Sequence, residues 1–232
     1  MIITKAKAEI ITPCIDDEQA IAIAREDVYL EIERAARTCY KSEVPVDLKR
    51  QDKFIRGLVN AQHFAMIEHG SATVRFTVDR GVSHEIVRHR IASFAQESTR
   101  YCNYGDDKFG NNVTFIRPCF LEEGTPKYEL WRDAMKFAEA AYMQMLEYGA
   151  TPQEARSLLP NSVKTEVVMK ADMTEWRHFF RLRAIGATGK PHPQMQEVAV
   201  PLLKRFSEIW PAIFYDLDIE AFQKGVYKEH GI

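Results

Sequence analysis

The strand signal is clearest in Ala72-Thr73-Val74-Arg75-Phe76-Thr77-Val78-Asp79, where apolar and polar side chains alternate. Successive side chains of a strand point to opposite faces, so this alternation predicts a strand with one buried face. We therefore expect a strand over residues 72–79 whose apolar side chains, from Ala72 to Val78, pack against the core.

A helical segment is expected to follow this strand. Between Gly81 and Arg90, Val82 and Ile86, with Val87 beside them, fall on one helical face. The segment would deliver three cationic or potentially cationic residues, Arg88-His89-Arg90, at its C-terminal end. Positive charge also suits the dipole at a helix C-terminus, so part of this cluster could be structural.

The polar stretch that begins there is Arg88-His89-Arg90-Ile91-Ala92-Ser93-Phe94-Ala95-Gln96-Glu97-Ser98-Thr99-Arg100-Tyr101. Planar guanidinium groups match the paired oxygens of a phosphate, and hydroxyl groups can satisfy its remaining lone pairs. A solvated basic helix end would instead mix Lys and Glu at helical spacing. The stretch therefore predicts a site for an anion, with phosphate as the best match.

Six positions of this stretch resemble the signature of the flavin-dependent thymidylate synthases: Arg88, His89, Arg90, Ser93, Ser98 and Arg100. A later run is also typical of that family, namely Trp176-Arg177-His178-Phe179-Phe180, followed by Leu182-Arg183 and His192-Pro193-Gln194-Met195. The resemblance extends from about residue 30 to about residue 200 and so covers most of the chain.

The resemblance implies a reaction, the reductive methylation of deoxyuridylate (dUMP) at C5 to give thymidylate (dTMP). Methylenetetrahydrofolate would give the carbon and leave as tetrahydrofolate, NADPH would give electrons, and FAD would carry them as hydride. No protein nucleophile is required in this scheme. The task of the protein would be to orient the reactants and control their charge.

The resemblance also implies roles for individual residues. Arg183 would be catalytic, because its charge would stabilise negative charge that develops on the uracil ring. The residues implied for FAD are Arg88, His89, Arg90, Gln96 and His178. The residues implied for dUMP are Glu85, Arg88, Gln96, Glu97, Ser98, Thr99, Arg100, Arg156 and Arg183, with Arg100 and Arg156 on its phosphate. On spacing alone, Arg156 and the set Arg177, Arg181 and Arg183 could equally be exposed helix residues.

Two further segments are implied to lie near the flavin, and the sequence departs from the family at three positions. Arg34–Ser42 is similar to a segment that runs beside the flavin, and His63 with Glu68-His69 to the loop that leads into its site. A single His is more often a hydrogen-bonded structural residue than a catalyst. Three residues differ from many relatives: Ala65 lacks a hydroxyl group, and Asp172 and Thr174 replace Asn and Arg.

The family assembles as a homotetramer with flavin sites shared between subunits. We therefore expect the Arg88 region of one chain to complete a site with residues of another. One alternative is an FAD-binding or nucleotide-binding relative that has lost methylation activity, which the three departures allow. Another is a nucleic-acid-binding module, which 31 Lys and Arg against 33 Asp and Glu and a net charge of -2 disfavour.

Other motifs do not support a metal site, a phosphate loop or a nucleophile. His84-Glu85 lacks the second histidine of a zinc hydrolase, because Arg88 occupies that position and would repel a dication. Residues 105–110 have the glycine spacing of a phosphate loop without its Lys, so we expect a surface turn there. We expect Cys102 to be a small packing residue, since nothing marks it as having a lowered pKa.

The overall composition is that of one ordinary globular domain. With 232 residues, 46% of them hydrophobic and 28% charged, the chain suits a single domain over residues 1–232. Its four cysteines are not paired closely, and no hydrophobic leader or membrane span is apparent, so we expect a cytoplasmic protein. The order of strands and helices predicts an α+β fold, a mostly antiparallel sheet flanked by helices.

The remaining elements are predicted from periodicity and capping residues. Strands are expected between Ile2 and Ile11 and over Val163–Met169. Helices are expected over Asp27–Cys39, from Asp47 after Pro45 to about His63, from Thr125-Pro126 to Gly149, from Thr151-Pro152 past Arg156, and over Glu175–Arg183 after a Thr174 cap. The third of these is expected to be a core helix through Leu130, Ala134, Phe137, Ala138, Ala141, Tyr142 and Met145.

Overall fold

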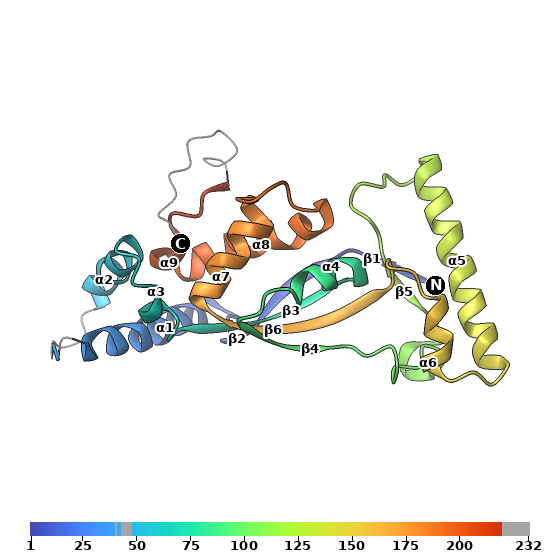
Figure 1. Ribbon diagram of the computed structural model, residues 1–232, viewed down its shortest axis with the longest axis horizontal. Helices are drawn as coiled ribbons and strands as arrows, with labels where there is room; N and C mark the ends of the chain where they lie inside the picture. The colour runs from blue at the N-terminus through green and yellow to red at the C-terminus, as the bar shows by residue number, and fades with distance from the viewer. Residues whose placement is uncertain (40, 43–47, 220–232) are drawn as a thin grey trace. The chain divides into compact units, whose positions relative to one another are not determined.

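The computed structural model describes residues 1–39, 41–42 and 48–219 (Figure 1). Its strands are β1 (Ile2–Thr4), β2 (Lys7–Thr12), β3 (Ser71–Asp79), β4 (Ala92–Gln96), β5 (Thr114–Ile116) and β6 (Lys164–Asp172). Its helices are α1 (Glu18–Thr38), α2 (Leu48–Asn60), α3 (Phe64–Ile67), α4 (Arg80–Ile86), α5 (Pro126–Glu147), α6 (Pro152–Ala155), α7 (Met173–Phe180), α8 (Pro193–Ile209) and α9 (Pro211–Phe214). Short 3-10 segments occur at η1 (Asp107–Phe109) and η2 (Arg156–Leu158), and η3 (Arg181–Ile185) is a π-helical turn.

The strands form an antiparallel sheet accompanied by helices, which confirms the predicted α+β class. A four-stranded sheet has the order β2-β3-β6-β4, and β1 pairs separately with β5. The β1–β5 pair is parallel, with Ile3 opposite Phe115, so the sheets are mostly rather than wholly antiparallel.

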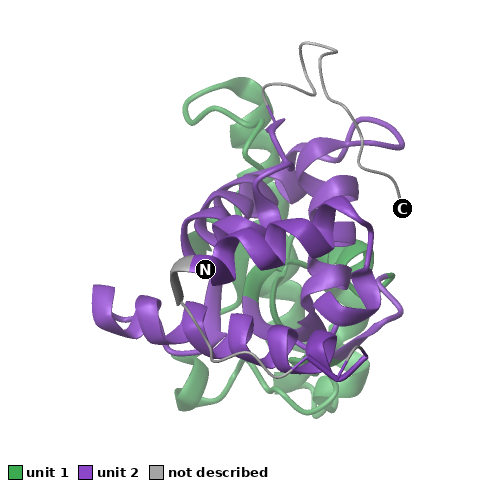
Figure 2. Ribbon diagram, turned by 90° about the vertical axis from the view of Figure 1, so that its left-hand side faces the viewer, with its two compact units in different colours: residues 1–7, 76–88, 94–168 green, residues 8–75, 89–93, 169–232 purple. Residues whose placement is uncertain are grey.

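The chain divides into two compact units, coloured in Figure 2. Of the described residues, unit 1 contains 1–7, 76–88 and 94–168, and unit 2 contains 8–39, 41–42, 48–75, 89–93 and 169–219. Each unit is assembled from separate segments, and β3 and β6 each begin in one unit and end in the other. This division by contacts is not a division into domains along the sequence, so the single domain over residues 1–232 stays a prediction.

The strand that the sequence indicates most clearly is confirmed as β3. Its apolar side chains Ala72, Val74, Phe76 and Val78 are all buried, as the alternation predicts. The C-terminal end of the strand is buried on its other face as well, and Asp79 there caps α4 by accepting a hydrogen bond of 2.7 Å from the Val82 backbone N–H. The strand therefore sets where α4 begins.

Unit 2 is held together by an aromatic core. The ring centroids of neighbouring members lie 5.0 to 5.9 Å apart, and the members are Trp176, Phe179, Phe180, Phe206, Trp210 and Phe214. The two indole N–H groups are satisfied by backbone carbonyls, Trp176 donating to Ala72 at 3.1 Å and Trp210 to Ala24 at 3.2 Å. Large buried rings with satisfied polar atoms pack rigidly, so α7 has a fixed position within this unit.

Unit 1 has its own core around α5. The buried members of this core are Tyr104, Val113, Phe115, Met135, Tyr142, Ala155 and Val163. The predicted start of α5 is confirmed, because Pro126 is its first residue and the Thr125 hydroxyl accepts a hydrogen bond from the Tyr128 N–H at 3.3 Å. Helix α6 lies beside α5, and its predicted start at Thr151-Pro152 is confirmed by a capping box with Glu154.

The predicted core face of α5 is wrong in part. Leu130 and Phe137 are 75% and 77% exposed, whereas the buried residues of the helix are Tyr128, Met135 and Tyr142. The helix carries two apolar stripes, and helical periodicity cannot tell which of them faces the core of its own chain.

Two helix starts and one strand also differ from the predictions. Helix α1 begins at Glu18 rather than Asp27, because Asp17 caps it by accepting a 2.7 Å hydrogen bond from Ala20 N–H. The residues expected to start α2, Pro45 and Asp47, and Tyr40 of the segment expected beside the flavin, lie outside the described residues. At the N-terminus, the single expected strand is divided into β1 and β2.

Several elements were not predicted. Strand β4 falls inside the polar motif and has no fully buried residue, so its hydrophobic signal is weak. Strand β5 is only three residues long. Helix α8 contains Pro201, a residue that usually ends a helical pattern.

Candidate active site

Helix α7 is capped at its N-terminus by Asp172, one of the residues that depart from the family pattern. Its carboxylate accepts a 2.8 Å hydrogen bond from the Glu175 backbone N–H, so Asp172 and not the predicted Thr174 is the N-cap. The Thr174 hydroxyl instead donates to the Phe64 carbonyl at 3.0 Å and ties α7 to α3. Burial raises the pKa of Asp172 above its usual range. Both departures thus have structural roles in unit 2.

The C-terminal end of α7 runs into the π-helical turn η3, which contains Arg183. The turn ends at Gly186, whose φ of 84° lies in the left-handed region. Its N–H and that of Ala187 both donate to the Arg181 carbonyl, at 2.9 and 3.0 Å. Single π turns in helices are rare and occur frequently at functional sites. Arg183 is therefore held on an irregular but well-bonded turn.

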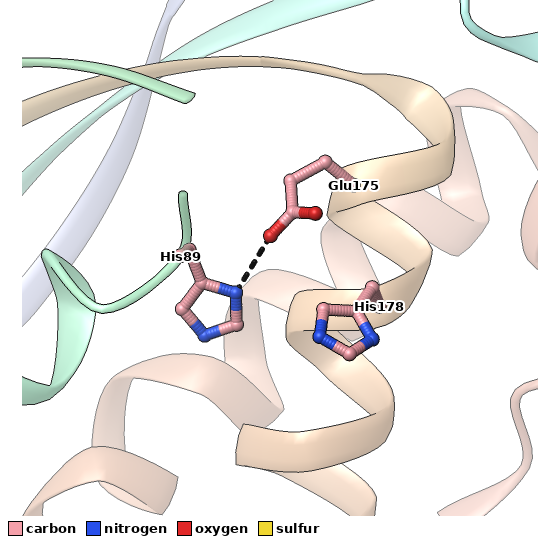
Figure 3. Close-up of side chains that lie close together, drawn as sticks. All are labelled: His89, Glu175 and His178. Atoms are coloured by element: carbon pink, nitrogen blue, oxygen red, sulfur yellow. Dashed lines mark hydrogen bonds and ion pairs between the residues drawn. The ribbon is translucent and has the colours of Figure 1, made fainter. Parts of the chain in front are cut away.

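A buried polar cluster joins this region to the motif residue His89 (Figure 3). His89 Nδ1 lies 2.7 Å from Glu175 Oε1, and these residues are only 3% and 6% exposed. On its other side, His89 Nε2 lies 3.3 Å from Arg183 Nε. The His89 ring also packs against Phe179 and His178, with ring centroids 5.0 and 5.7 Å away. The structure thus brings together three residues that the resemblance implied for the flavin and the uracil.

The protonation of His89 follows from its partners. An ionised carboxylate only accepts hydrogen bonds, so the nitrogen that faces Glu175 carries the proton. The arginine Nε–H only donates, so the nitrogen that faces Arg183 offers a lone pair. Burial lowers the pKa of the neighbouring His178. The two contacts of His89 therefore place its proton on Nδ1 and its lone pair on Nε2.

The same side chains could be considered as metal ligands. One nitrogen or oxygen from each of His89, Glu175 and His178 lies within 4.8 Å of the others. However, the hydrogen bond from Arg183 occupies the lone pair of His89, and its guanidinium would repel a cation. Both ring nitrogens of His89 have partners without an ion, so we assign Glu175, His89 and Arg183 as a hydrogen-bonded network.

A second group of predicted residues lies in unit 1, around the loop Ser98–Arg100. Arg100 Nε donates to Gln153 Oε1 of α6 at 2.8 Å. Arg156, which follows α6, reaches back to the same loop, with Nη1 3.5 Å from Thr99 Oγ1. Both arginines are exposed, so their guanidinium groups are available to an anion from solvent. The loop and the end of α6 together form a cationic surface that carries the exposed Arg100 and Arg156.

Glu97 has partners on both carboxylate oxygens. It accepts a 2.9 Å hydrogen bond from the Tyr104 hydroxyl and forms a 2.8 Å ion pair with Lys164. Burial alone would lower the pKa of Lys164, but its contacts with Glu97 and Glu166 outweigh this effect and raise it. Burial, reinforced by Glu97, raises the pKa of Tyr104. Glu97 therefore supports the loop that begins at Ser98.

The other predicted residues of unit 1 lie on α4 and β4. The side-chain amide of Gln96 donates to Ser83 Oγ at 3.1 Å and lies 3.4 Å from Thr165 Oγ1. Glu85 is half-buried on α4, and Arg88 is exposed just after that helix. Helix α4 ends at Ile86, so the predicted continuation to Arg90 is wrong. Strand β4 begins a few residues later, at Ala92.

Cys102 lies just beyond this loop. Burial and the nearby Glu97 carboxylate raise the pKa of its thiol. A raised pKa reduces the fraction of nucleophilic thiolate. This agrees with the prediction that Cys102 is a packing residue rather than a nucleophile.

The predicted site residues fall into two groups when they are sorted by unit. Unit 1 contains Glu85, Arg88, Gln96, Glu97, Ser98, Thr99, Arg100 and Arg156. Unit 2 contains His89, Arg90, His178 and Arg183. Most of the residues implied for the nucleotide thus belong to one unit, and most of those implied for the flavin to the other.

Unit 2 also contains an apolar cavity of about 280 Å³. It is lined by Ala36, Arg37, Cys39, Ser42, Phe54, Leu58, His63, Ala65 and Met66. Arg37 is fixed at its edge by a 2.7 Å hydrogen bond to the buried Glu33 and lies over the Phe54 ring. The cavity contains residues of both segments implied to lie near the flavin. The sequence did not predict that Phe54, Leu58 and Met66 line a cavity, because apolar residues at helical spacing indicate only a buried helix face.

Comparison with known proteins places the chain in a family. The family model described as thymidylate synthase complementing protein matches residues 24–212. The chain belongs to this family.

Several relatives of this chain are named flavin-dependent thymidylate synthase, the family that the Arg88–Arg100 motif resembles. A flavin-dependent thymidylate synthase of Mycobacteroides abscessus is 29% identical over 84% of this chain and 81% of the relative. One of Corynebacterium glutamicum is 27% identical over 92% and 88%, and one of Geobacter sulfurreducens 29% over 87% and 82%. These matches confirm the predicted relationship to the flavin-dependent thymidylate synthases, which are enzymes.

Solved structures share the fold of this family member. The UMP/dUMP methylase PolB from Streptomyces cacaoi, bound with 5-Br dUMP, matches with a TM-score of 0.72 and 21% identity over 97% of both chains. The same protein bound with 5-Br UMP matches with a TM-score of 0.71 and 20% identity over 96% of this chain and 97% of PolB. Among the described residues, no helix is both long enough and apolar enough to cross a membrane.

Proposed function

We propose that this protein methylates dUMP at C5 to form dTMP, with methylenetetrahydrofolate as carbon donor and NADPH as reductant. The observation that carries the proposal is the pair of exposed guanidinium groups, Arg100 and Arg156, which link one loop to the end of one helix in a chain of this family. A nucleotide phosphate is the anion that suits such a pair. The names of the relatives and the nucleotide bound to PolB support the same substrate class.

The nucleotide would be held by unit 1 residues on and around the cationic surface of Arg100 and Arg156. Arg100 and Arg156 would bind the phosphate, with Ser98 and Thr99 offering hydroxyl groups beside them. Gln96 would contribute its amide, Arg88 its guanidinium and Glu85 its carboxylate. Glu97 would act mainly through the loop, because its oxygens already bind Tyr104 and Lys164. A phosphate fixed in this way lowers the entropy cost of orienting the base.

Arg183 would act on the uracil ring. Its positive charge would stabilise the negative charge that develops on the ring as C5 becomes nucleophilic. The guanidinium is already oriented by His89, so little reorganisation is needed in the transition state. This is electrostatic stabilisation by a preorganised group, and it needs no covalent attachment to the protein.

The residues present fit a flavin nucleotide. Arg88, His89, Arg90, Gln96 and His178 supply cationic and hydrogen-bonding groups of the kind that a dinucleotide phosphate and a flavin ring require. The cavity lined by His63 and Ala65 is close to the small end of the usual pocket range, about 300 Å³, and suits one ring system rather than a whole dinucleotide. FAD, when bound, would supply the hydride. Asp172 and Thr174 are left out of this set, since both have structural partners.

We also propose a homotetramer with sites shared between subunits. The apolar stripe of α5 that includes Leu130 and Phe137 is exposed, and exposed apolar patches are typical of association surfaces. Sedimentation at micromolar concentration should therefore give four copies, and Phe137→Glu should lower that number. A monomer that binds FAD tightly would contradict the shared site.

A cytoplasmic location agrees with all four cysteines being thiols.

The test of the activity is anaerobic conversion of dUMP by the purified protein with FAD, NADPH and methylenetetrahydrofolate, followed by chromatography. We expect thymidylate that depends on FAD and falls sharply in Arg183→Ala. UMP should be assayed in parallel, because PolB is described with nucleotides of both sugars. A protein that retains FAD after desalting but forms no product would overturn the proposed reaction.

A further inference from the structure

We propose that Glu175 is a positioning residue for Arg183, and that it acts by fixing the tautomer of His89. The inference rests on the proposed function, in which Arg183 acts on the uracil ring. The order of contacts is Glu175, His89 and Arg183, with a 2.7 Å hydrogen bond at the first step and a 3.3 Å hydrogen bond at the second. All three residues belong to unit 2.

The first step of this chain sets the proton on the imidazole. A neutral histidine can carry its proton on either nitrogen, and its hydrogen-bond partners decide which. Glu175 and His89 are both almost fully buried, so water cannot compete with the carboxylate for Nδ1–H. The lone pair of the ring is therefore directed through Nε2, away from Glu175.

The second step uses that lone pair. The Arg183 Nε–H donates to His89 Nε2, and this bond is lost if Nε2 carries a proton. A guanidinium is planar, so fixing Nε–H sets the plane of the whole group. Glu175 thus influences the orientation of Arg183 through the histidine that lies between them.

A purely structural role for Glu175 explains less of this geometry. An acidic residue in the first turn of a helix can interact with the helix dipole, but such a residue needs no particular side-chain partner. Here the N-terminal cap is already supplied by Asp172, which accepts from the Glu175 N–H. The Glu175 side chain is buried and turned toward His89 (Figure 3).

The test compares Glu175→Gln with Asp216→Asn. Glutamine has the same shape, but its amide can donate to His89 Nδ1 and so favour the wrong tautomer, as happens when the carboxylate of a catalytic triad is replaced by an amide. We expect kcat for dTMP formation to fall about 10- to 100-fold, the loss that is typical when a residue that orients a metal-binding side chain is replaced. The KM for dUMP should change little. Asp216→Asn also removes a buried carboxylate partner of an α7 residue, Arg177, and should leave the kcat of the folded protein unchanged.

The tautomer itself is measured independently of turnover. In protein labelled with 15N-histidine, the His89 resonances should show a protonated Nδ1 and an unprotonated Nε2, and Glu175→Gln should shift the proton toward Nε2. If the wild-type protein forms no dTMP, the proposed function fails, and this spectrum still decides whether Glu175 fixes His89. If dTMP forms but Glu175→Gln keeps its kcat, or His89 has the opposite tautomer, the positioning role is overturned.

A second pair of variants applies where Glu175→Gln does not fold. His89→Gln places an amide oxygen near the position of Nε2, and this oxygen can still accept a hydrogen bond from Arg183. The side chain in His89→Asn is shorter, so it retains only an amide N–H that donates toward Glu175. We expect His89→Gln to keep more kcat than His89→Asn. Equal losses in the two variants would contradict the proposal.

Discussion

Arg177 and Asp216 form a two-pronged ion pair within unit 2, with Nη1–Oδ1 and Nη2–Oδ2 distances both 2.7 Å. Their side chains are 5% and 7% exposed, and the Arg177 guanidinium also donates to the Ile213 carbonyl. Arg177, which on spacing alone could have been an exposed residue of α7, therefore ties that helix to the segment after α9.

Asp216→Asn should lower the free energy of unfolding by about 3 kcal/mol, because it leaves the buried Arg177 charge without its counter-ion. Urea unfolding followed by circular dichroism would measure the change. Glu208→Gln is the matched control, since Glu208 pairs with Arg205 at the exposed surface, where such a pair contributes about 1 kcal/mol or less. Equal losses in the two variants would contradict the burial argument.

Gly186→Ala should destabilise the turn that contains Arg183. A Cβ at this position would lie 2.8 Å from Pro191 Cδ and 2.9 Å from the Gly189 carbonyl oxygen, and φ is 84°. We expect a loss of about 1 to 3 kcal/mol from backbone strain, with additional loss from the clash, and a lower kcat. Gly149→Ala separates the two effects, because Gly149 has a φ of 86° but a Cβ there would meet no atom within 4 Å. A Gly186→Ala protein as stable and active as Gly149→Ala would show that the close contacts are unimportant.

Arg100→Ala and Arg156→Ala should each weaken binding of dUMP. A hydrogen bond to a charged group contributes about 1.5 to 3 kcal/mol, so we expect the dissociation constant to rise about 10- to 100-fold. Deoxyuridine, which has no phosphate, should bind equally weakly to the variants and to the wild type in calorimetry. Arg205→Ala, on α8, serves as the control for loss of an exposed arginine. If a variant binds dUMP more tightly than deoxyuridine by the same factor as the wild type, the phosphate must bind elsewhere.

His178 should make the stability of the protein depend on pH. Burial lowers its folded pKa below the 6.5 of an unperturbed histidine, an effect reinforced by nearby cations including Arg181 and only partly offset by Glu175. The unfolded state therefore takes up protons first as the pH falls. The free energy of unfolding should decrease as the pH is lowered through about 6.5 toward the folded pKa. His178→Gln should flatten this part of the curve of unfolding free energy against pH, and an unchanged slope would contradict the prediction.

Cys102→Ala should retain thymidylate formation. The raised pKa of this thiol leaves little thiolate at neutral pH, and the proposed chemistry requires no cysteine. Initial rates measured beside the wild type would test this. Complete loss of activity in a folded Cys102→Ala protein, with dUMP binding intact, would require a covalent mechanism.

The sequence contained the information for the strongest elements and for the residue types of the site. Strand β3 follows from its alternation, and the starts of α5 and α6 from Thr-Pro caps, since these signals are local. The order of the elements predicted the fold class, whereas the implied site residues depended on the resemblance to a family, because no local pattern states which distant residues meet.

Other features depend on tertiary partners and were beyond sequence reasoning. The buried face of α5 was ambiguous because Leu130 and Met135 belong to different apolar stripes of one helix. The cap of α7 was assigned to Thr174 because hydroxyl groups and carboxylates both make good caps. The contact of Glu175 with His89 joins positions 86 residues apart, and no spacing rule links them.

The two sides of helix α7 have different neighbours. Trp176, Phe179 and Phe180 belong to the aromatic core, whereas Glu175 and His178 face the polar cluster. Mutations on the polar side can therefore accumulate without loss of the anchor that holds the helix. A substitution of Glu175 or His178 would therefore change the polar cluster while the aromatic contacts that hold α7 stay the same.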